Sequence, residues 1–150
     1  MKTDFFRLIE SHAGGVFRSH APLPDRALES ASQGKLRVVP VRLVAARDKN
    51  AVLNAIAKAL QFPDYFGHNW DAFYVCLLDL PHSDGAGTLL VLREASGFAR
   101  AEPEEFAAAA AALQDAADYW KGENKALLVV VELEALALAP ELAEINCPTL

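Results

Sequence analysis

Three short runs of large aliphatic residues alternate with stretches of helical periodicity, and this alternation restricts the fold more than any other feature. The runs cover residues 36–46, 88–93 and 126–133, and they consist mainly of Val and Leu. Each run is typical of a buried β-strand. The periodic stretches cover residues 51–60, 69–80 and 103–120. Strands joined by helices predict a small α/β domain with mainly parallel strand pairing.

Residues suited to helix ends stand at the expected boundaries. Asp48 and Asn69 are side chains that can accept a hydrogen bond from the first turn of a helix. Pro103 suits the first turn of a third helix, and Gly122 suits its end. Before residue 36, we expect a short helix near residues 3–11, a short edge strand at 16–18 and a loop over 19–35, with a turn of helix at Arg26–Ser30 as an option.

The acidic balance of the chain is concentrated in one segment. The 150 residues carry 14 Lys+Arg and 20 Asp+Glu, for a formal net charge of −6. A general phosphate-binding surface is basic, so this balance argues against direct binding of nucleic acid. No Lys or Arg occurs from Ala59 to Leu92, where Asp64, Asp71, Asp79 and Asp84 lie. This segment predicts a negative surface, although chance clustering on a solvated face is the alternative.

Nothing at the N-terminus or in the apolar runs indicates export or a membrane. The first ten residues are too short and too charged for a signal peptide. The longest apolar runs fall well short of the roughly 20 residues that a membrane span needs. The two cysteines provide no disulfide framework. We therefore expect a cytoplasmic protein with no membrane partner.

Signals for catalysis or metal binding are weak. The sequence contains no phosphate-binding glycine loop, nucleophile elbow or paired-His zinc motif. The pairs His68/Asp71 and Asp79/His82 each lack a third metal ligand at a recognised spacing, so we predict no metal site. Cys76 falls on the apolar stripe of its helix and is interpreted as a buried structural thiol. An acid/base pair of Asp71 and Asp79 is a further alternative, and we predict no catalytic residue.

The outer face of the helix that follows Asn69 has an unusual composition. Asp71, Val75 and Asp79 are spaced four residues apart and therefore line one row. Trp70 and Tyr74 also lie off the buried stripe. Large aromatic groups beside carboxylates are typical of a protein-binding surface. The alternative is that both aromatic rings are buried against the preceding loop or the N-terminal extension.

One continuous motif carries a family resemblance. The run is Phe62-Pro63-Asp64-Tyr65-Phe66-Gly67-His68-Asn69-Trp70-Asp71-Ala72-Phe73. It resembles the loop and second helix of the barstar family, the intracellular inhibitors of barnase-type ribonucleases. The order of the flanking strands and helices also agrees, over roughly residues 36–133. The resemblance implies a small three-stranded, mainly parallel sheet packed with helices, with an extra edge strand from the N-terminal extension as a further option.

The resemblance also assigns residues to a partner-binding surface. Tyr65 matches the family tyrosine, Gly67 the loop glycine and Asp71 the first carboxylate of the helix. Tyr74 stands where the family has an exposed tryptophan. Val75 stands where the family has its most important aspartate, and a valine cannot accept a hydrogen bond.

Two further positions complete the expected surface. Trp70 lies within the motif. Asp79 lies one turn after Val75 and could accept the hydrogen bonds that the family aspartate accepts, if the partner enzyme has a different shape. A further family acid would fall near Asp115 or Asp118.

The resemblance implies a non-enzymatic inhibitor that blocks a small, basic, guanyl-specific ribonuclease or related toxin nuclease without a cofactor. The domain would cover residues 36–133, between an N-terminal extension (1–35) and a C-terminal tail (134–150). Two alternatives remain open. One is an adaptor of the same fold for another basic partner, and the other is a small hydrolase that uses His68 and Asp71.

Overall fold

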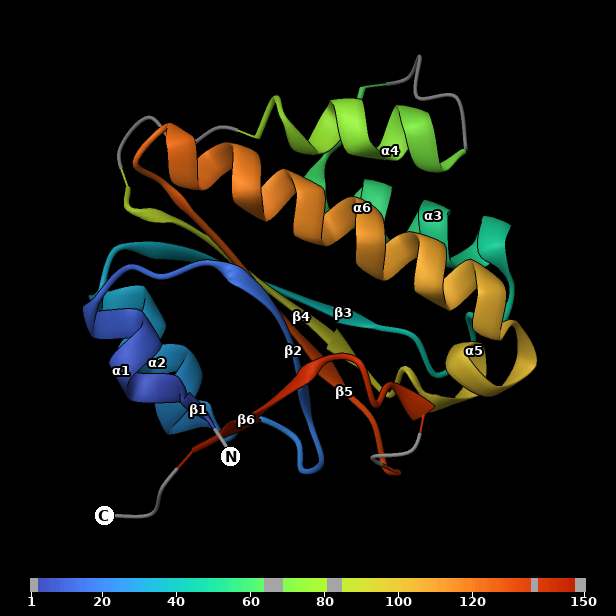
Figure 1. Cartoon of the computed structure of the whole chain (residues 1–150), viewed down its shortest axis with the longest axis horizontal. Helices are drawn as coiled ribbons and strands as arrows, with labels where there is room; N and C mark the ends of the chain where they lie inside the picture. Colours follow the sequence, from blue (N-terminus) through green and yellow to red (C-terminus); the bar gives the residue numbers. More distant parts are fainter. Residues whose placement is uncertain (1–2, 64–68, 81–84, 136–137, 148–150) are drawn as a thin grey trace.

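The computed structural model describes residues 3–63, 69–80, 85–135 and 138–147, and these form a parallel sheet with helices on both faces (Figure 1). Within these ranges the sheet has six strands in the order β1-β6-β2-β5-β4-β3. Every pair of neighbouring strands is parallel. The prediction of an α/β fold with parallel pairing is therefore confirmed.

The strands are β1 (Thr3–Asp4), β2 (Gly15–Ser19), β3 (Leu36–Arg42), β4 (Gly87–Arg93), β5 (Ala126–Glu132) and β6 (Ala143–Asn146). The helices are α1 (Phe5–Glu10), α2 (Asp25–Gln33), α3 (Lys49–Leu60), α4 (Trp70–Leu77), α5 (Ser96–Ala101) and α6 (Pro103–Gly122). Within the described ranges, no helix combines the length and the apolar character needed to cross a bilayer.

The prediction of a small three-stranded sheet is wrong. β2 does not lie at an edge, because it pairs with β5 over residues 15–19 and with β6 at Phe17 and Arg18. β1 then pairs with the other side of β6. With only three strands, the wholly buried β5 would have left a row of backbone donors and acceptors at an edge. The two ends of the chain supply the strands that continue the sheet beyond β5.

Both faces of the central strands are buried, which explains their continuous apolar sequences. In β5, Leu127, Val129 and Val131 face the core under α3, α4 and α6. Leu128 and Val130 face the opposite core, under α1 and α2. β4 alternates in the same way. Each apolar residue of these strands therefore packs against one of the two helix layers.

The contact between β4 and β5 depends on a glycine. Gly87, the first residue of β4, has φ of +149°, and a Cβ built there would lie 1.9 Å from the carbonyl oxygen of Ala126. No larger residue fits this approach without moving one of the strands. The two strands that carry the center of the core therefore meet closely at their N-terminal ends.

Candidate functional site

The candidate surface is built on α4, whose start is set by a local cap. Asn69 accepts a 2.7 Å hydrogen bond from the backbone N–H of Ala72, and this satisfies one of the unpaired donors of the first turn. Asp71 also lies in that turn, where a carboxylate is favourable beside the positive end of the helix. The predicted site residues Tyr65 and Gly67 lie outside the described residues, as does His68 of the hydrolase alternative.

The inner face of α4 is fully packed. Phe73 and Leu77 are inaccessible to solvent, and the ring of Phe73 lies 6.0 Å from that of Phe62 and 5.3 Å from that of Trp70. Cys76 is 8% exposed, so the prediction of a buried thiol is confirmed. Burial, and secondarily the negative charge of Asp79, raises the pKa of this thiol. Cys76 therefore stays protonated and acts as an apolar packing residue.

Two tryptophans attach the ends of α4 to α6. The indole Nε1 of Trp70 donates a 2.7 Å hydrogen bond to Oε2 of Glu105, in the first turn of α6. At the other end, Nε1 of Trp120 donates a 2.8 Å hydrogen bond to the carbonyl oxygen of Leu77. An eight-residue helix is marginal on its own, so these contacts and the apolar stripe position it.

The structure shows how far the rings of Trp70 and Tyr74 are covered by neighbouring elements. Trp70 and Tyr74 are both half-buried. Trp70 packs against Phe73 and α6, whereas α1 and α2 of the N-terminal extension lie on the opposite face of the sheet (Figure 1). The outer surface of α4 is therefore not covered by those two helices.

The outer face of α4 exposes an apolar residue between two carboxylates. Val75 is 57% exposed, and Asp71 and Asp79 are exposed on either side of it in sequence. The helix ends at Leu77, earlier than the predicted Leu80, so Asp79 lies in the following turn, where its N–H bonds to the carbonyl of Cys76 at 3.1 Å. Within the described ranges, neither carboxylate forms an ion pair. Both are therefore available to a cation from outside the chain.

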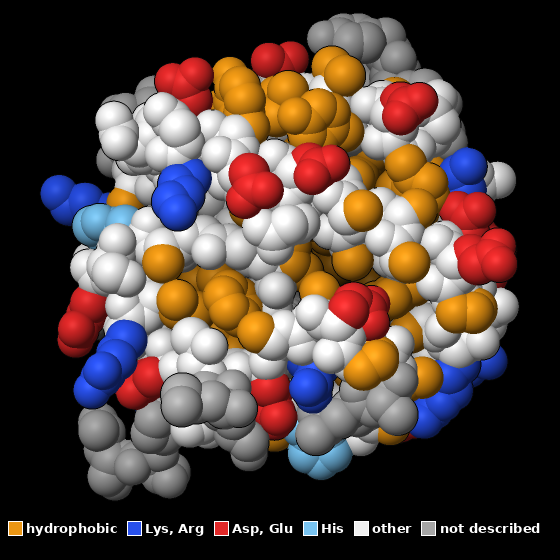
Figure 2. Space-filling model, in the orientation of Figure 1, with side chains coloured by type: hydrophobic (Ala, Val, Ile, Leu, Met, Phe, Trp, Pro, Cys, Tyr) orange, Lys and Arg blue, Asp and Glu red, His pale blue; other side chains and the backbone are white. Residues whose placement is uncertain are grey.

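The C-terminal half of α6 lies beside the end of α4. Tyr119 is 39% exposed, and its ring packs edge-on at 5.3 Å against Trp120, which itself contacts α4. Asp115 and Asp118, the two candidates for a further acid, are exposed on the same helix. Figure 2 shows apolar side chains gathered in the upper part of the molecule, where Figure 1 places α4, with acidic side chains around them.

Sequence reasoning missed two contacts that position α4, those made by Glu105 and Trp120. The usable signal was the indole N–H of each tryptophan, which requires an acceptor when the ring is partly buried. The acceptors could not be identified because they lie 35 and 43 residues away. In the described part of the chain, no cluster of three or more His, Cys, Asp or Glu residues is arranged to hold a metal ion.

Comparison with known proteins finds a family model and solved structures that match the chain. The ORC2 protein of Aeropyrum pernix, solved in ADPNP-ADP complexes, has a similar fold, with a TM-score of 0.56 and 16% sequence identity over 91% of this chain. The match spans only 41% of that protein. Because it covers nearly all of this chain, it supports a larger α/β fold than the expected three-stranded sheet. A search of curated proteins finds no match. The family model described as Barstar (barnase inhibitor) matches residues 36–132, well over half of the chain, and the chain therefore belongs to the barstar family.

Proposed function

We propose that this protein inhibits a small ribonuclease or related toxin nuclease by covering its active site with the outer face of α4. The observation that carries the proposal is the pair of exposed carboxylates of Asp71 and Asp79 on either side of the exposed Val75. Neither carboxylate has an ion-pair partner among the described residues. Membership of the barstar family supports a protein partner of this class. The protein would act by occupying the site, with no chemistry of its own and no cofactor.

The charges explain how such a surface would compete with RNA. A nuclease must hold phosphate, so its active site carries arginine, lysine or protonated histidine. Carboxylates presented to that site form charge-assisted hydrogen bonds with the groups that would otherwise bind phosphate. The segment from Ala59 to Leu92 has no Lys or Arg that would oppose this attraction. The same charges accelerate association at low salt.

The exposed Val75 predicts the shape of the partner's surface. An exposed valine flanked by carboxylates fits a small apolar depression beside a cationic site, and desolvation of its side chain would contribute to affinity. A partner that instead presents an arginine to this position would find no acceptor. We therefore propose that the cognate nuclease differs from barnase-type enzymes where it meets Val75.

The remaining contacts come from residues around α4. Trp70 and Tyr74 are half-buried and present only part of their rings, so they would act at the rim of the contact. Tyr65 and Gly67, on the loop that precedes α4, are proposed as contacts from the family motif alone. Such an inhibitor would act in the cytoplasm of a bacterial cell that makes the nuclease, as a toxin-immunity protein.

The test is titration of guanyl-specific ribonucleases and related toxin nucleases with the full chain. Residual RNA cleavage and calorimetric binding would be measured at two salt concentrations. We expect one-to-one inhibition that weakens as salt rises. Asp71→Asn should weaken binding by about tenfold or more, because a hydrogen bond to a charged group contributes about 1.5–3 kcal/mol.

A matched control is available on the opposite helix layer. Asp25, like Asp71, is an exposed aspartate in the first turn of a helix. Asp25→Asn changes the net charge and the helix end in the same way, and it should leave inhibition unchanged. Failure of every nuclease in a broad panel to bind would refute the inhibitor proposal. Equal effects of the two substitutions would instead show that α4 is not the contact surface.

A further inference from the structure

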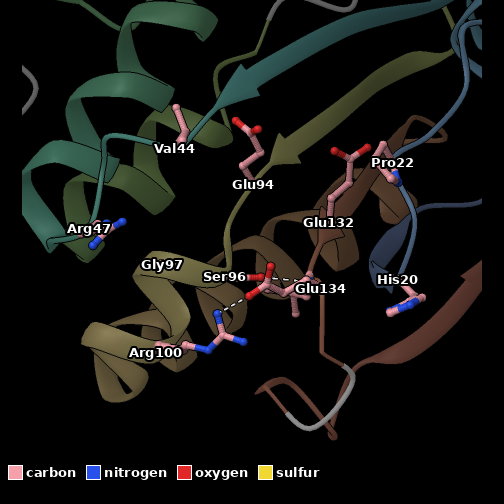
Figure 3. Close-up of a pocket in the computed structure, with 11 residues that line it drawn as sticks. His20, Pro22, Val44, Arg47, Glu94, Ser96, Gly97, Arg100, Glu132 and Glu134 are labelled. Atoms are coloured by element: carbon pink, nitrogen blue, oxygen red, sulfur yellow. Dashed lines mark hydrogen bonds and ion pairs between the residues drawn. The ribbon is translucent and has the colours of Figure 1, made fainter.

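A crevice lies at the carboxyl ends of β3, β4 and β5, which end at Arg42, Arg93 and Glu132. It has a volume of about 540 Å³, and it is lined by Pro22, Pro40, Arg42, Arg93, Glu94 and Glu132. Figure 3 shows Glu94 beyond the end of β4 and Glu132 beside Pro22. Open parallel sheets bind ligands at this edge, and the volume is within the range of small-molecule sites.

The strand register places two arginines side by side in this crevice. Arg42 and Arg93 are paired residues of β3 and β4, and neighbouring strands lie about 4.8 Å apart. Val38 and Val91, earlier in the same strands, pack on the side of α1 and α2. Because side chains alternate along a strand, both arginines project from that face. Figure 1 shows α1 and α2 toward the start of these strands, so the two helices leave the carboxyl ends uncovered.

Arg93 is held in place by a buried carboxylate. Its Nη1 lies 3.6 Å from Oε2 of Glu132, which also accepts a 2.7 Å hydrogen bond from the backbone N–H of Leu23. Nη2 of Arg93 donates a 3.5 Å hydrogen bond to the carbonyl oxygen of Leu23. Glu132 is only 6% exposed, so its contacts belong to the fold. Arg93 is therefore fixed at the inner side of the crevice, beside Arg42.

Arg42 is paired with a carboxylate that a ligand can replace. Its Nη2 lies 3.5 Å from Oε2 of Glu94, and the two side chains are 74% and 49% exposed. This distance is long beside the roughly 2.7–2.9 Å of a strong hydrogen bond between charged groups. An exposed pair of this kind contributes little to stability. An external carboxylate can therefore displace Glu94 from Arg42 at a small cost.

The backbone at Glu94 is a second, independent sign of a binding site. Glu94 has φ of +57°, in the left-handed region that residues other than glycine seldom adopt. In the described ranges, the other non-glycine residues with positive φ lie at the ends of helices, where this conformation is common. They are His12, Lys35, Gln61 and Asn124. Glu94 instead directly follows β4, and strained residues of this kind are concentrated at ligand sites.

We propose that this crevice binds a small organic acid, whose carboxylate displaces Glu94 from Arg42 and bridges to the neighbouring Arg93. The planar guanidinium group of arginine suits a carboxylate ligand. A single carboxylate replaces Glu94 charge for charge at Arg42. The exposed rings of Pro22 and Pro40 offer apolar contacts to the body of the acid. This site does not depend on the proposed action of α4, because the two surfaces share no residue.

The test is titration of the full chain with sodium benzoate at constant ionic strength, followed by NMR of the arginine Nε–H groups. We expect saturable shifts at Arg42 and Arg93 at up to millimolar concentration. Benzamide keeps the ring without the charge and should bind about tenfold more weakly or worse. Acetate keeps the charge without the ring and should also bind more weakly than benzoate. Binding of inorganic phosphate as tight as that of benzoate would overturn the assignment of a carboxylate ligand.

Two variants should change the affinity for benzoate in opposite directions. Arg42→Gln should weaken binding by about tenfold or more. Glu94→Gln should strengthen it by up to about fivefold, because the competing carboxylate is removed. Arg7→Gln and Glu29→Gln, on α1 and α2, are the matched controls and should bind as the parent does.

All four positions are exposed, so the variants should fold. Absence of saturable shifts at both arginines overturns the proposal, as does full affinity in Arg42→Gln. An affinity of Glu94→Gln no higher than that of the parent also overturns it.

Discussion

The indole Nε1 of Trp70 donates a 2.7 Å hydrogen bond to Oε2 of Glu105, and this contact joins the start of α4 to the start of α6. Both groups are partly buried, so each would lose a compensating partner if the other were removed. The contact orients α4 so that Asp71 and Val75 face outward. The acidic surface proposed to meet a nuclease therefore depends on a glutamate that does not belong to it.

Removing this acceptor should destabilise the fold. Glu105→Ala is expected to lower the free energy of unfolding by about 1–3 kcal/mol, because the Trp70 N–H is left without its partner. Glu104 is the control, since it lies beside Glu105 in the same helical turn and is exposed. Glu104→Ala should change stability by less than about 0.5 kcal/mol. Urea unfolding of the three proteins measures both values, and equal losses would contradict the role given to the Trp70–Glu105 contact.

Substitution of two valines that are almost equally exposed distinguishes an effect on partner binding from a general effect of changing the surface. Val75 on α4 is 57% exposed and Val44, after β3, is 55% exposed. Neither Val→Ala change should alter stability by more than about 0.5 kcal/mol. Val75→Ala should weaken binding to the cognate nuclease, and Val44→Ala should not, as measured by calorimetry. Equal affinities for both variants would count against a contact at Val75.

The opposite change at Val75 tests the specificity of the surface. Val75→Asp adds a hydrogen-bond acceptor where the family has an aspartate, so it should increase affinity for barnase-type ribonucleases. Because the side chain is exposed, the substitution should leave the fold intact, which circular dichroism can verify. Inhibition of RNA cleavage by parent and variant measures the effect. An unchanged or lower affinity would show that Val75 does not determine which nuclease is bound.

Glu132 should make stability depend on pH. Burial raises its pKa above the ordinary value of 4.5, so between these two values the folded state holds more protons than the unfolded state. The free energy of unfolding should therefore fall as pH rises through this interval. Glu132→Gln keeps an acceptor for Leu23 but cannot ionise, so it should remove this part of the pH dependence.

Thermal unfolding across the acidic to neutral range compares Glu132→Gln with the parent. Glu123→Gln, at an exposed position beyond α6, is the control and should retain the parent's pH dependence near Glu132's interval. The same fall of stability with pH in Glu132→Gln as in the parent would show that Glu132 does not contribute as its burial indicates.

Two glycines test the close contact between β4 and β5. Gly87→Ala places a Cβ against the carbonyl of Ala126 at a φ of +149°, so we expect a loss of about 3 kcal/mol or more. Gly122, at the end of α6, has no atom within 4 Å of an added Cβ. Gly122→Ala should be neutral or stabilise by up to about 1 kcal/mol. Similar stabilities for the two variants in urea unfolding would contradict this account of Gly87.

The central part of the fold could be predicted because its signals are local. Continuous Val and Leu runs identified β3, β4 and β5, and Asn69 marked the start of α4 through a hydrogen bond within its own first turn. The row of Asp71, Val75 and Asp79 also followed from helical spacing, although the helix ends before Asp79. For these features, the residues that determine the conformation are neighbours in the chain.

The sequence by itself determined the strands β3, β4 and β5, the helices between them, and the negative charge of α4. Only the tertiary structure decided that β2 lies inside the sheet, that α4 is held by Glu105 and Trp120, and that Glu132 meets Leu23 across 109 residues. The physical reason is the origin of the stabilising contacts. Strands as short as β1 and β6 have too few residues for a periodic pattern, and they are stabilised by hydrogen bonds to a partner strand that is distant in the chain.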